Sequence, residues 1–118
     1  MYRSLEFFEK TNSTCPVEDF LKTLDVKTHQ KAMAVFELIE TLKLIPKKFF
    51  KKLVGTDDLW EIRIEFKSNI YRFLCVLHKG HLVVLTHGFQ KKTDKTPSGD
   101  IKLAEQYKKE YLERMKQK

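Results

Sequence analysis

The chain has 118 residues, of which 42% are hydrophobic and 33% are charged, and its formal net charge is +7. This length fits one domain (residues 1–118) with a single core, and no apolar run approaches the roughly 20 residues of a membrane-spanning helix. Two cysteines make no disulfide framework and no signal peptide follows Met1, so we expect a cytoplasmic protein with two free thiols.

The chain begins with a predicted strand, at residues 2–8, followed by two helices. Pro16 lies in the first turn of the first helix, and Asp25 is a candidate N-cap of the second, which Pro46 stops. Apolar residues recur at helical spacing in both. These are Val17, Phe20, Leu21 and Leu24 in the first helix, and Ala32, Val35, Phe36, Ile39 and Leu42 in the second.

Three strands and a final helix are predicted in the second half, after a turn cluster at residues 55–58. The strands are residues 60–66, 70–77 and 82–89, and the helix begins at Ser98 or Asp100. The β-α-α-β-β-β-α order predicts an α+β fold, with a small antiparallel sheet and two helices on one face. The opposite face is left for the C-terminal helix, for solvent or for a partner.

Turn geometry predicts which side chains share a face of this sheet. A two-residue loop at Lys79-Gly80 would pair His78 with His81 and place Arg72 directly across from His87. A two-residue loop near Ser68 would put Arg63 opposite Arg72 or one pair away. A three-residue loop would turn every following side chain over.

The predicted polar face carries four candidate catalytic residues: Arg63, Arg72, His87 and Lys91. Guanidinium groups bind phosphate oxygens in a bidentate manner, and an imidazole exchanges protons near neutral pH. Two alternatives stay open. Glu61 and Glu65 could neutralise Arg63 in a structural ion pair, and His87 could be a packing residue.

Positive charge is concentrated around these strands, since residues 46–98 carry eleven Lys or Arg against five Asp or Glu. Such a field attracts polyanions, nucleic acids first among them, although lysines also simply maintain solubility. The candidate RNA- or ribosome-binding residues are Lys47, Lys48, Lys51, Lys52, Lys92 and Lys95. The first four surround Phe49 and Phe50, which could stack on bases or belong to the core. No zinc-ligand spacing or glycine-rich phosphate loop occurs, so we expect no metal and no cofactor.

Three motifs, LWEIRI (59–64), YRFL (71–74) and THGFQKKTDKTP (86–97), resemble the RelE/ParE toxin superfamily, specifically its HigB-like, phage-derived branch. The resemblance spans most of the chain. It implies a microbial-ribonuclease-like α+β fold and a type II toxin that cleaves mRNA on the ribosome. It also implies neutralisation by a cognate, HigA-like antitoxin with a helix-turn-helix domain.

By position, Arg63 and Arg72 match basic strand residues that the superfamily associates with the scissile phosphate, and Lys91 matches another basic position. One departure concerns a tyrosine that RelE uses shortly after the last basic position. Here the nearest residues are Thr93, Thr96 and Pro97, and the next tyrosine is Tyr107. We therefore nominate His87 as general base for attack of a 2′-hydroxyl on the adjacent phosphate.

Two other functions fit the same sequence. A ParE-like inhibitor of gyrase would need no convergent polar site. A plain nucleic-acid-binding module would use the lysines without turnover, and its affinity would fall steeply with salt.

Overall fold

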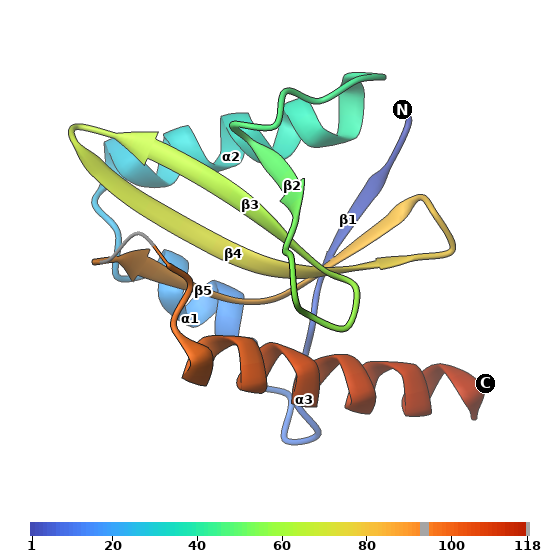
Figure 1. Cartoon of the computed structure of the whole chain (residues 1–118). Helices are drawn as coiled ribbons and strands as arrows, with labels where there is room; N and C mark the ends of the chain where they lie inside the picture. The colour runs from blue at the N-terminus through green and yellow to red at the C-terminus, as the bar shows by residue number, and fades with distance from the viewer. Residues whose placement is uncertain (93–94, 118) are drawn as a thin grey trace.

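The structure, a computed structural model, describes residues 1–92 and 95–117. Its elements follow one another in the order shown in Figure 1. They are β1 (Ser4–Phe7), α1 (Pro16–Leu21), α2 (Val26–Thr41), β2 (Phe50–Lys52), β3 (Leu59–Phe66), β4 (Asn69–His78), β5 (Leu82–Lys91) and α3 (Ser98–Lys116). The predicted α+β class is confirmed, and the sequence did not reveal the short strand β2.

The sheet has five strands in the order β1-β5-β4-β3-β2. β2, β3, β4 and β5 form antiparallel pairs, whereas β1 runs parallel to β5. The prediction of a purely antiparallel sheet was therefore wrong at one edge. A parallel neighbour needs a long connection, and residues 8–81, which contain α1, α2 and the strands β2 to β4, provide it.

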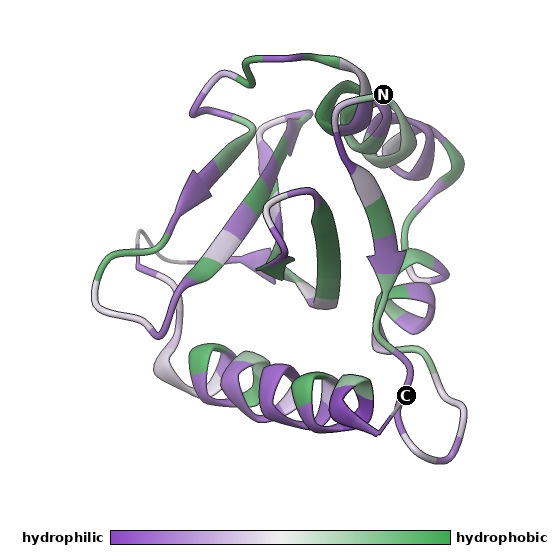
Figure 2. Cartoon of the chain, turned by 90° about the vertical axis from the view of Figure 1, so that its right-hand side faces the viewer, coloured by the Kyte–Doolittle hydropathy of each residue, from purple (hydrophilic) through white to green (hydrophobic). Residues whose placement is uncertain are grey.

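Helices cover both faces of this sheet (Figure 1). α1 and α2 pack on one face, over a core that includes Phe36, Ile39, Ile62 and Phe73. α3 packs on the other face, where Ala104, Tyr107 and Tyr111 are buried against the sheet. Figure 2 shows hydrophobic and hydrophilic residues alternating along α3, as expected for a helix with one buried side.

Helix starts follow the expected local chemistry. Pro16 opens α1, where its missing amide proton costs nothing. The Asp25 carboxylate caps α2 by accepting from the Thr28 amide at 2.8 Å. This bond to the charged form lowers the pKa of Asp25. α3 begins at Ser98, one of the two predicted starting residues.

The two hairpins close differently. Lys67 and Ser68 form the expected two-residue loop, both with positive φ, and Arg63 faces Arg72 across the strands. The β4–β5 loop has three residues, because His78 pairs with Leu82 and not with His81. That prediction was wrong, and Val83 and Leu85 consequently face the core beneath α1 and α2.

A β-bulge then restores His87 to the face predicted for it. The register shifts between Leu74 and Cys75, so that Leu74 pairs with His87 and Cys75 with Leu85. Thr86 is the extra residue, and its hydroxyl donates to the Leu74 carbonyl at 2.9 Å. His87 and Phe89 therefore lie on the face covered by α3, whereas Val83 and Leu85 do not.

Both cysteines are free and buried, as expected. Burial raises the pKa of Cys15, and raises that of Cys75 well above its ordinary value, so neither thiol is activated. Within residues 1–92 and 95–117, no helix combines the length and hydrophobicity needed to cross a membrane.

Gly88 is expected to be the most sensitive glycine of the fold. A Cβ there would lie 2.5 Å from the Phe73 ring and 2.7 Å from the Phe20 ring, inside both side chains. We expect Gly88→Ala to lower the free energy of unfolding by about 1–3 kcal/mol through overpacking. Gly99→Ala is the matched control, since no heavy atom lies within 4 Å of its Cβ position. Equal midpoints of the two variants in urea would contradict the contact.

Candidate functional site

The four candidate catalytic residues lie on one face of the sheet. Arg63 pairs with Arg72, while His87 pairs with Leu74 and Lys91 with Ile70. Residues 70, 72 and 74 alternate onto the same side, so the four side chains share the α3 face. Arg72 lies across from Phe89, which makes the predicted direct pairing with His87 wrong. Arg72 and His87 are diagonal neighbours, a relation with a typical separation of about 7–8 Å.

The two arginines form the closest kind of cross-strand pair. The Arg63 amide donates to the Phe49 carbonyl on the β2 side at 2.9 Å, so the Arg63–Arg72 pair is not hydrogen-bonded. Side chains in such pairs come nearest, with Cβ atoms about 4.5–5.5 Å apart. Like charges directly opposite each other are destabilising, and this positive pair therefore needs a counter-charge.

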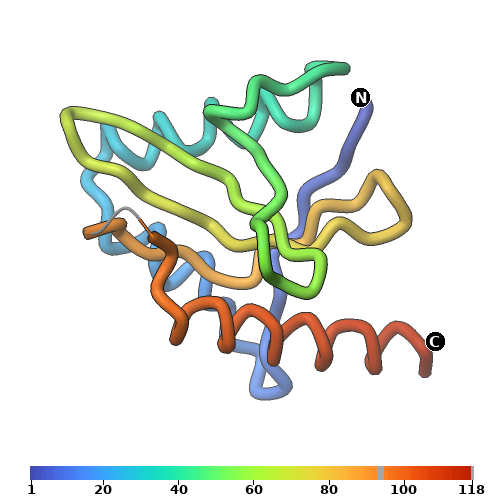
Figure 3. The backbone as a smooth tube through the Cα atoms, viewed as in Figure 1, coloured from blue at the N-terminus to red at the C-terminus, as the bar shows by residue number. Residues whose placement is uncertain are grey.

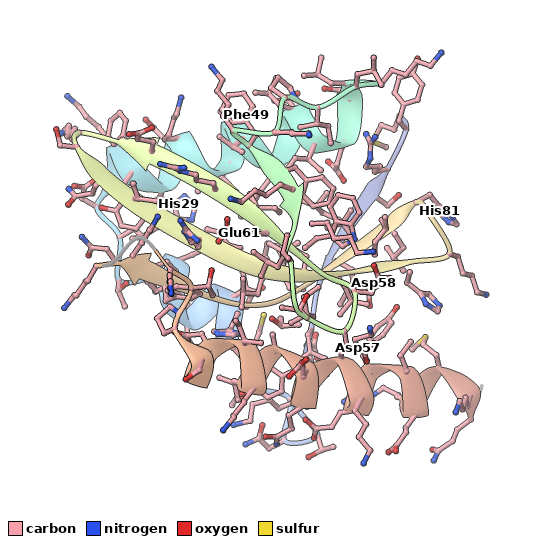
Figure 4. All side chains as sticks on the ribbon, in the orientation of Figure 1. His29, Phe49, Asp57, Asp58, Glu61 and His81 are labelled. Carbon is pink, nitrogen blue, oxygen red and sulfur yellow. The ribbon has the colours of Figure 1, made fainter. Side chains whose placement is uncertain are left out.

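Glu61 supplies that counter-charge to Arg72. Arg72 Nη1 donates to Glu61 Oε1 at 2.6 Å, and these residues are 3% and 0% exposed. The alternative that Glu61 or Glu65 pairs with Arg63 is therefore wrong. The Arg63 side chain is half-buried and makes no hydrogen bond or ion pair with the residues that the structure describes. Figure 4 shows Glu61 inside the fold, in contrast to His81 at the hairpin tip.

The buried ion pair is incompletely satisfied. Arg72 Nε and Glu61 Oε2 are buried and lack hydrogen-bond partners among the described residues. A side-on guanidinium–carboxylate pair would have used both atoms. Unsatisfied buried groups typically cost about 1–3 kcal/mol each, and native structures retain few of them. The pair therefore combines a strong contact with unused hydrogen-bonding capacity.

His87 is buried, and both of its ring nitrogens have partners. Nε2 lies 3.0 Å from Asp100 Oδ1, and Nδ1 lies 3.1 Å from Thr86 Oγ1. Burial lowers the pKa of His87, and the Asp100 carboxylate offsets part of that effect. A neutral ring with its proton on Nε2 donates to the Asp100 carboxylate, which only accepts, while the single proton of the Thr86 hydroxyl goes to the Leu74 carbonyl and not to Nδ1. The remaining lone pair then faces Thr86.

The segment that begins α3 covers Arg72 and His87. Arg72 Nη1 donates to Thr96 Oγ1 at 2.9 Å, and Asp100 holds His87 from the first turn of the helix. From the sequence, Thr96 was only a residue near the position of the missing tyrosine, and Asp100 only a possible helix start. The signal for both site residues was the KTP motif followed by a helix start, because it brings residues 96–100 back to the sheet.

Tyr107, the first tyrosine after the motif, is buried beside the same group. Its ring stacks on Phe8 at 4.8 Å and meets the His87 ring edge-on at 6.2 Å. Burial raises its pKa. Tyr107, in the middle of α3, therefore packs against His87 together with Phe8.

The candidate RNA-binding lysines divide between the two faces of the sheet. Lys51 pairs with Glu61 and so belongs to the site face, whereas Lys52 pairs with Trp60 and lies on the other. Lys52 also forms an exposed ion pair with Asp58 at 3.1 Å. Lys47 is exposed, and Lys48 lies 4.9 Å from the centre of the Phe49 ring. The lysines of residues 47–52 thus do not all point to one face of the sheet.

Of the aromatic residues between these lysines, Phe50 belongs to the core. It is 7% exposed and stacks on Trp60 at 4.9 Å. Phe49 is half-buried and packs against the same core. Base stacking on Phe50 is therefore excluded in this conformation.

The last basic segment is described in part. Lys91 is half-buried at the end of β5, and Lys92 and Lys95 are exposed. Thr93 lies outside the described residues. Among residues 1–92 and 95–117, no three His, Cys, Asp or Glu side chains converge as metal ligands.

Removing one partner of the Arg72–Glu61 pair should destabilise the fold more than removing both. Arg72→Met leaves a buried carboxylate uncompensated and is expected to cost about 3–5 kcal/mol of unfolding free energy. Arg72→Met/Glu61→Leu should recover most of that loss, because both charges are gone. Arg63→Met is the control, with a change below about 1 kcal/mol. Additive effects in urea denaturation would show that the pair is not coupled.

Protonation of His87 should destabilise the fold. Its pKa is lowered in the folded state, so the unfolded chain binds a proton more readily. The free energy of unfolding is therefore expected to fall as pH drops below about 6.5, the unperturbed value. The difference between wild type and His87→Gln across pH isolates this contribution from the carboxylates. A wild type that gains stability over the variant in acid would show that the Asp100 contact dominates.

The sequence matches the family of phage-derived Gp49-like proteins (DUF891) over residues 19–109. This range runs from α1 into α3 and includes the four candidate catalytic residues together with Glu61, Thr96 and Asp100. A search of curated proteins finds no match. Because the match covers well over half of its residues, the chain belongs to the Gp49-like family of phage-derived proteins.

Proposed function

We propose that this protein is the toxin of a type II toxin–antitoxin system and cleaves mRNA on the translating ribosome. The observation that carries the proposal is the Arg63–Arg72 pair, which shares a face with His87 and Lys91. One carboxylate, Glu61, contacts the pair, through Arg72, and Arg63 is left without an ionic partner among the described residues. Membership of the Gp49-like family and the resemblance to HigB-like toxins support the same assignment.

The reaction would be attack of a 2′-oxygen on the adjacent phosphorus. The bond to the 5′-oxygen breaks, and the products are a 2′,3′-cyclic phosphate and a 5′-hydroxyl that has taken up a proton. Arg63, Arg72 and Lys91 would stabilise the negative charge that grows on the phosphate oxygens. His87 would accept the 2′-hydroxyl proton at its Nδ1 lone pair, which faces Thr86 Oγ1.

The RNA would have to displace the contacts that close the site. The Thr96 hydroxyl occupies an Arg72 position where a phosphate oxygen could bind. A charged acceptor makes the stronger hydrogen bond, so the exchange is favourable once the phosphate is held nearby. The ribosome could provide that positioning, because a message bound in the decoding site has little freedom left to lose. The expected partners are therefore the ribosome, mRNA and a HigA-like antitoxin.

One observation favours a non-enzymatic inhibitor of the ParE type. Arg72 and His87 already have protein partners, as residues with a purely structural role would. Such a protein would leave message intact and impair DNA supercoiling by gyrase. The two functions differ in the product that accumulates after induction.

Arg63→Ala is the sharpest test of the nuclease, since removing Arg63 breaks no ion pair of the described structure. We expect it to lower mRNA cleavage on purified ribosomes about 10²–10³-fold, the usual effect of removing one charge-stabilising donor. Primer extension on a defined message measures the cleavage. Lys109→Ala removes an exposed charge on α3 and should cleave normally. Unchanged cleavage by folded Arg63→Ala would refute the site, and intact message with the wild-type protein would refute the function.

A further inference from the structure

One cavity lies on the side of the sheet away from Arg63, Arg72 and His87. Its volume is about 550 Å³, within the range of about 300–1,000 Å³ that is common for ligand sites. The N-terminal segment, the end of α2 and the tip of the β4–β5 hairpin meet beside it (Figure 3). Backbone hydrogen bonds connect them, from the Tyr2 amide to Glu40 and from the Ser4 amide to His81.

The cavity has apolar walls and a cationic rim. Its hydrophobic lining residues are Leu44, Ile45, Phe50, Trp60 and Leu77. Its charged lining residues are all basic: Arg3, Lys43, Lys47, Lys51 and Lys52. Lys43 and Lys47 have no ionic partner among the described residues, whereas Arg3 is held by backbone carbonyls of residues 39, 42 and 43. An occupant should therefore present acidic groups around an apolar centre.

The surface beside the cavity is also unusually apolar. Leu44 is 84% exposed, and Tyr2 and Leu42 are exposed next to it around Arg3. A cluster of exposed large apolar side chains beside a cavity is typical of a protein interface.

These features favour a protein segment over RNA. A nucleobase carries several polar edge groups, and the apolar walls offer them almost no partners. The Phe50 ring is already stacked on Trp60 and provides no free platform. A leucine or an aromatic side chain needs no such partners, and neighbouring carboxylates would meet the lysines.

We propose that this cavity is the docking site for an acidic protein segment with bulky apolar anchor residues. The proposal deepens the proposed function and rests on it for the identity of the carrier, which would be the antitoxin. Because the cavity and the Arg63–Arg72 pair lie on opposite faces of the sheet, this partner would bind without contacting Arg63, Arg72 or His87.

The test is selection of random phage-displayed peptides on the purified full chain. Peptides enriched in both Asp or Glu and large apolar residues are expected. Binding of a selected peptide, measured by fluorescence anisotropy, should weaken at least about tenfold with Leu44→Asp, and also with Lys43→Glu. Both side chains are exposed, so the variants should fold. Lys109→Glu makes the same charge change on α3 and should bind normally.

Two outcomes would overturn the proposal. One is that the selected peptides are not enriched in acidic and large apolar residues, or that Leu44→Asp leaves the affinity for a selected peptide unchanged. The other is that Leu44→Asp abolishes binding of single-stranded oligouridylate while peptide binding is unchanged, which would make the cavity an RNA site. The assay contains neither ribosomes nor message. A failed nuclease assay and a failed peptide assay are therefore separate results.

Discussion

One extra residue in β5 decides which groups can act together beneath α3. The three-residue loop at 79–81 sets the first half of β5 so that Val83 and Leu85 enter the core under α1 and α2. Continued without interruption, that alternation would turn His87 toward the same core. The bulge at Thr86 reverses it, and the hydrogen bond from the Thr86 hydroxyl to the Leu74 carbonyl stabilises the reversal. The strand thereby serves two purposes, with apolar packing at its start and polar side chains at its end.

The buried Arg72–Glu61 pair has two roles that oppose each other. As part of the fold it neutralises one of two facing arginines, and with Thr96 it anchors the start of α3. In the proposed reaction, the same guanidinium has to reach a phosphate. The unsatisfied Nε and Oε2 atoms show that the pair has not reached its best possible arrangement. Incomplete satisfaction of this kind keeps the arginine exchangeable, because a ligand has less to displace.

Alternation along the strands was sufficient to predict the core face of β3 and β4, and the shared face of Arg63 and Arg72. The Asp25 cap and the apolar stripe of α2 were equally local signals. The failures all involved contacts across the sheet. Loop length at residues 79–81, the bulge at Thr86 and the parallel pairing of β1 depend on the whole assembly and leave no periodic trace. For the same reason, the choice of Arg72 as the partner of Glu61, and the closure by Thr96 and Asp100, could not be derived from the sequence.

The parallel pairing of β1 with β5 has a consequence for synthesis. β1 is the first strand to be made and β5 the last, and because Ser4 pairs with Leu82, about two thirds of the chain separates the two partners. Closing so long a loop is slow, and β5 lies between β1 and β4 in the sheet. An unfinished copy that lacks β5 consequently leaves β1 without a neighbour and lacks His87 and Lys91, so the proposed group of four residues cannot assemble before β5 is made.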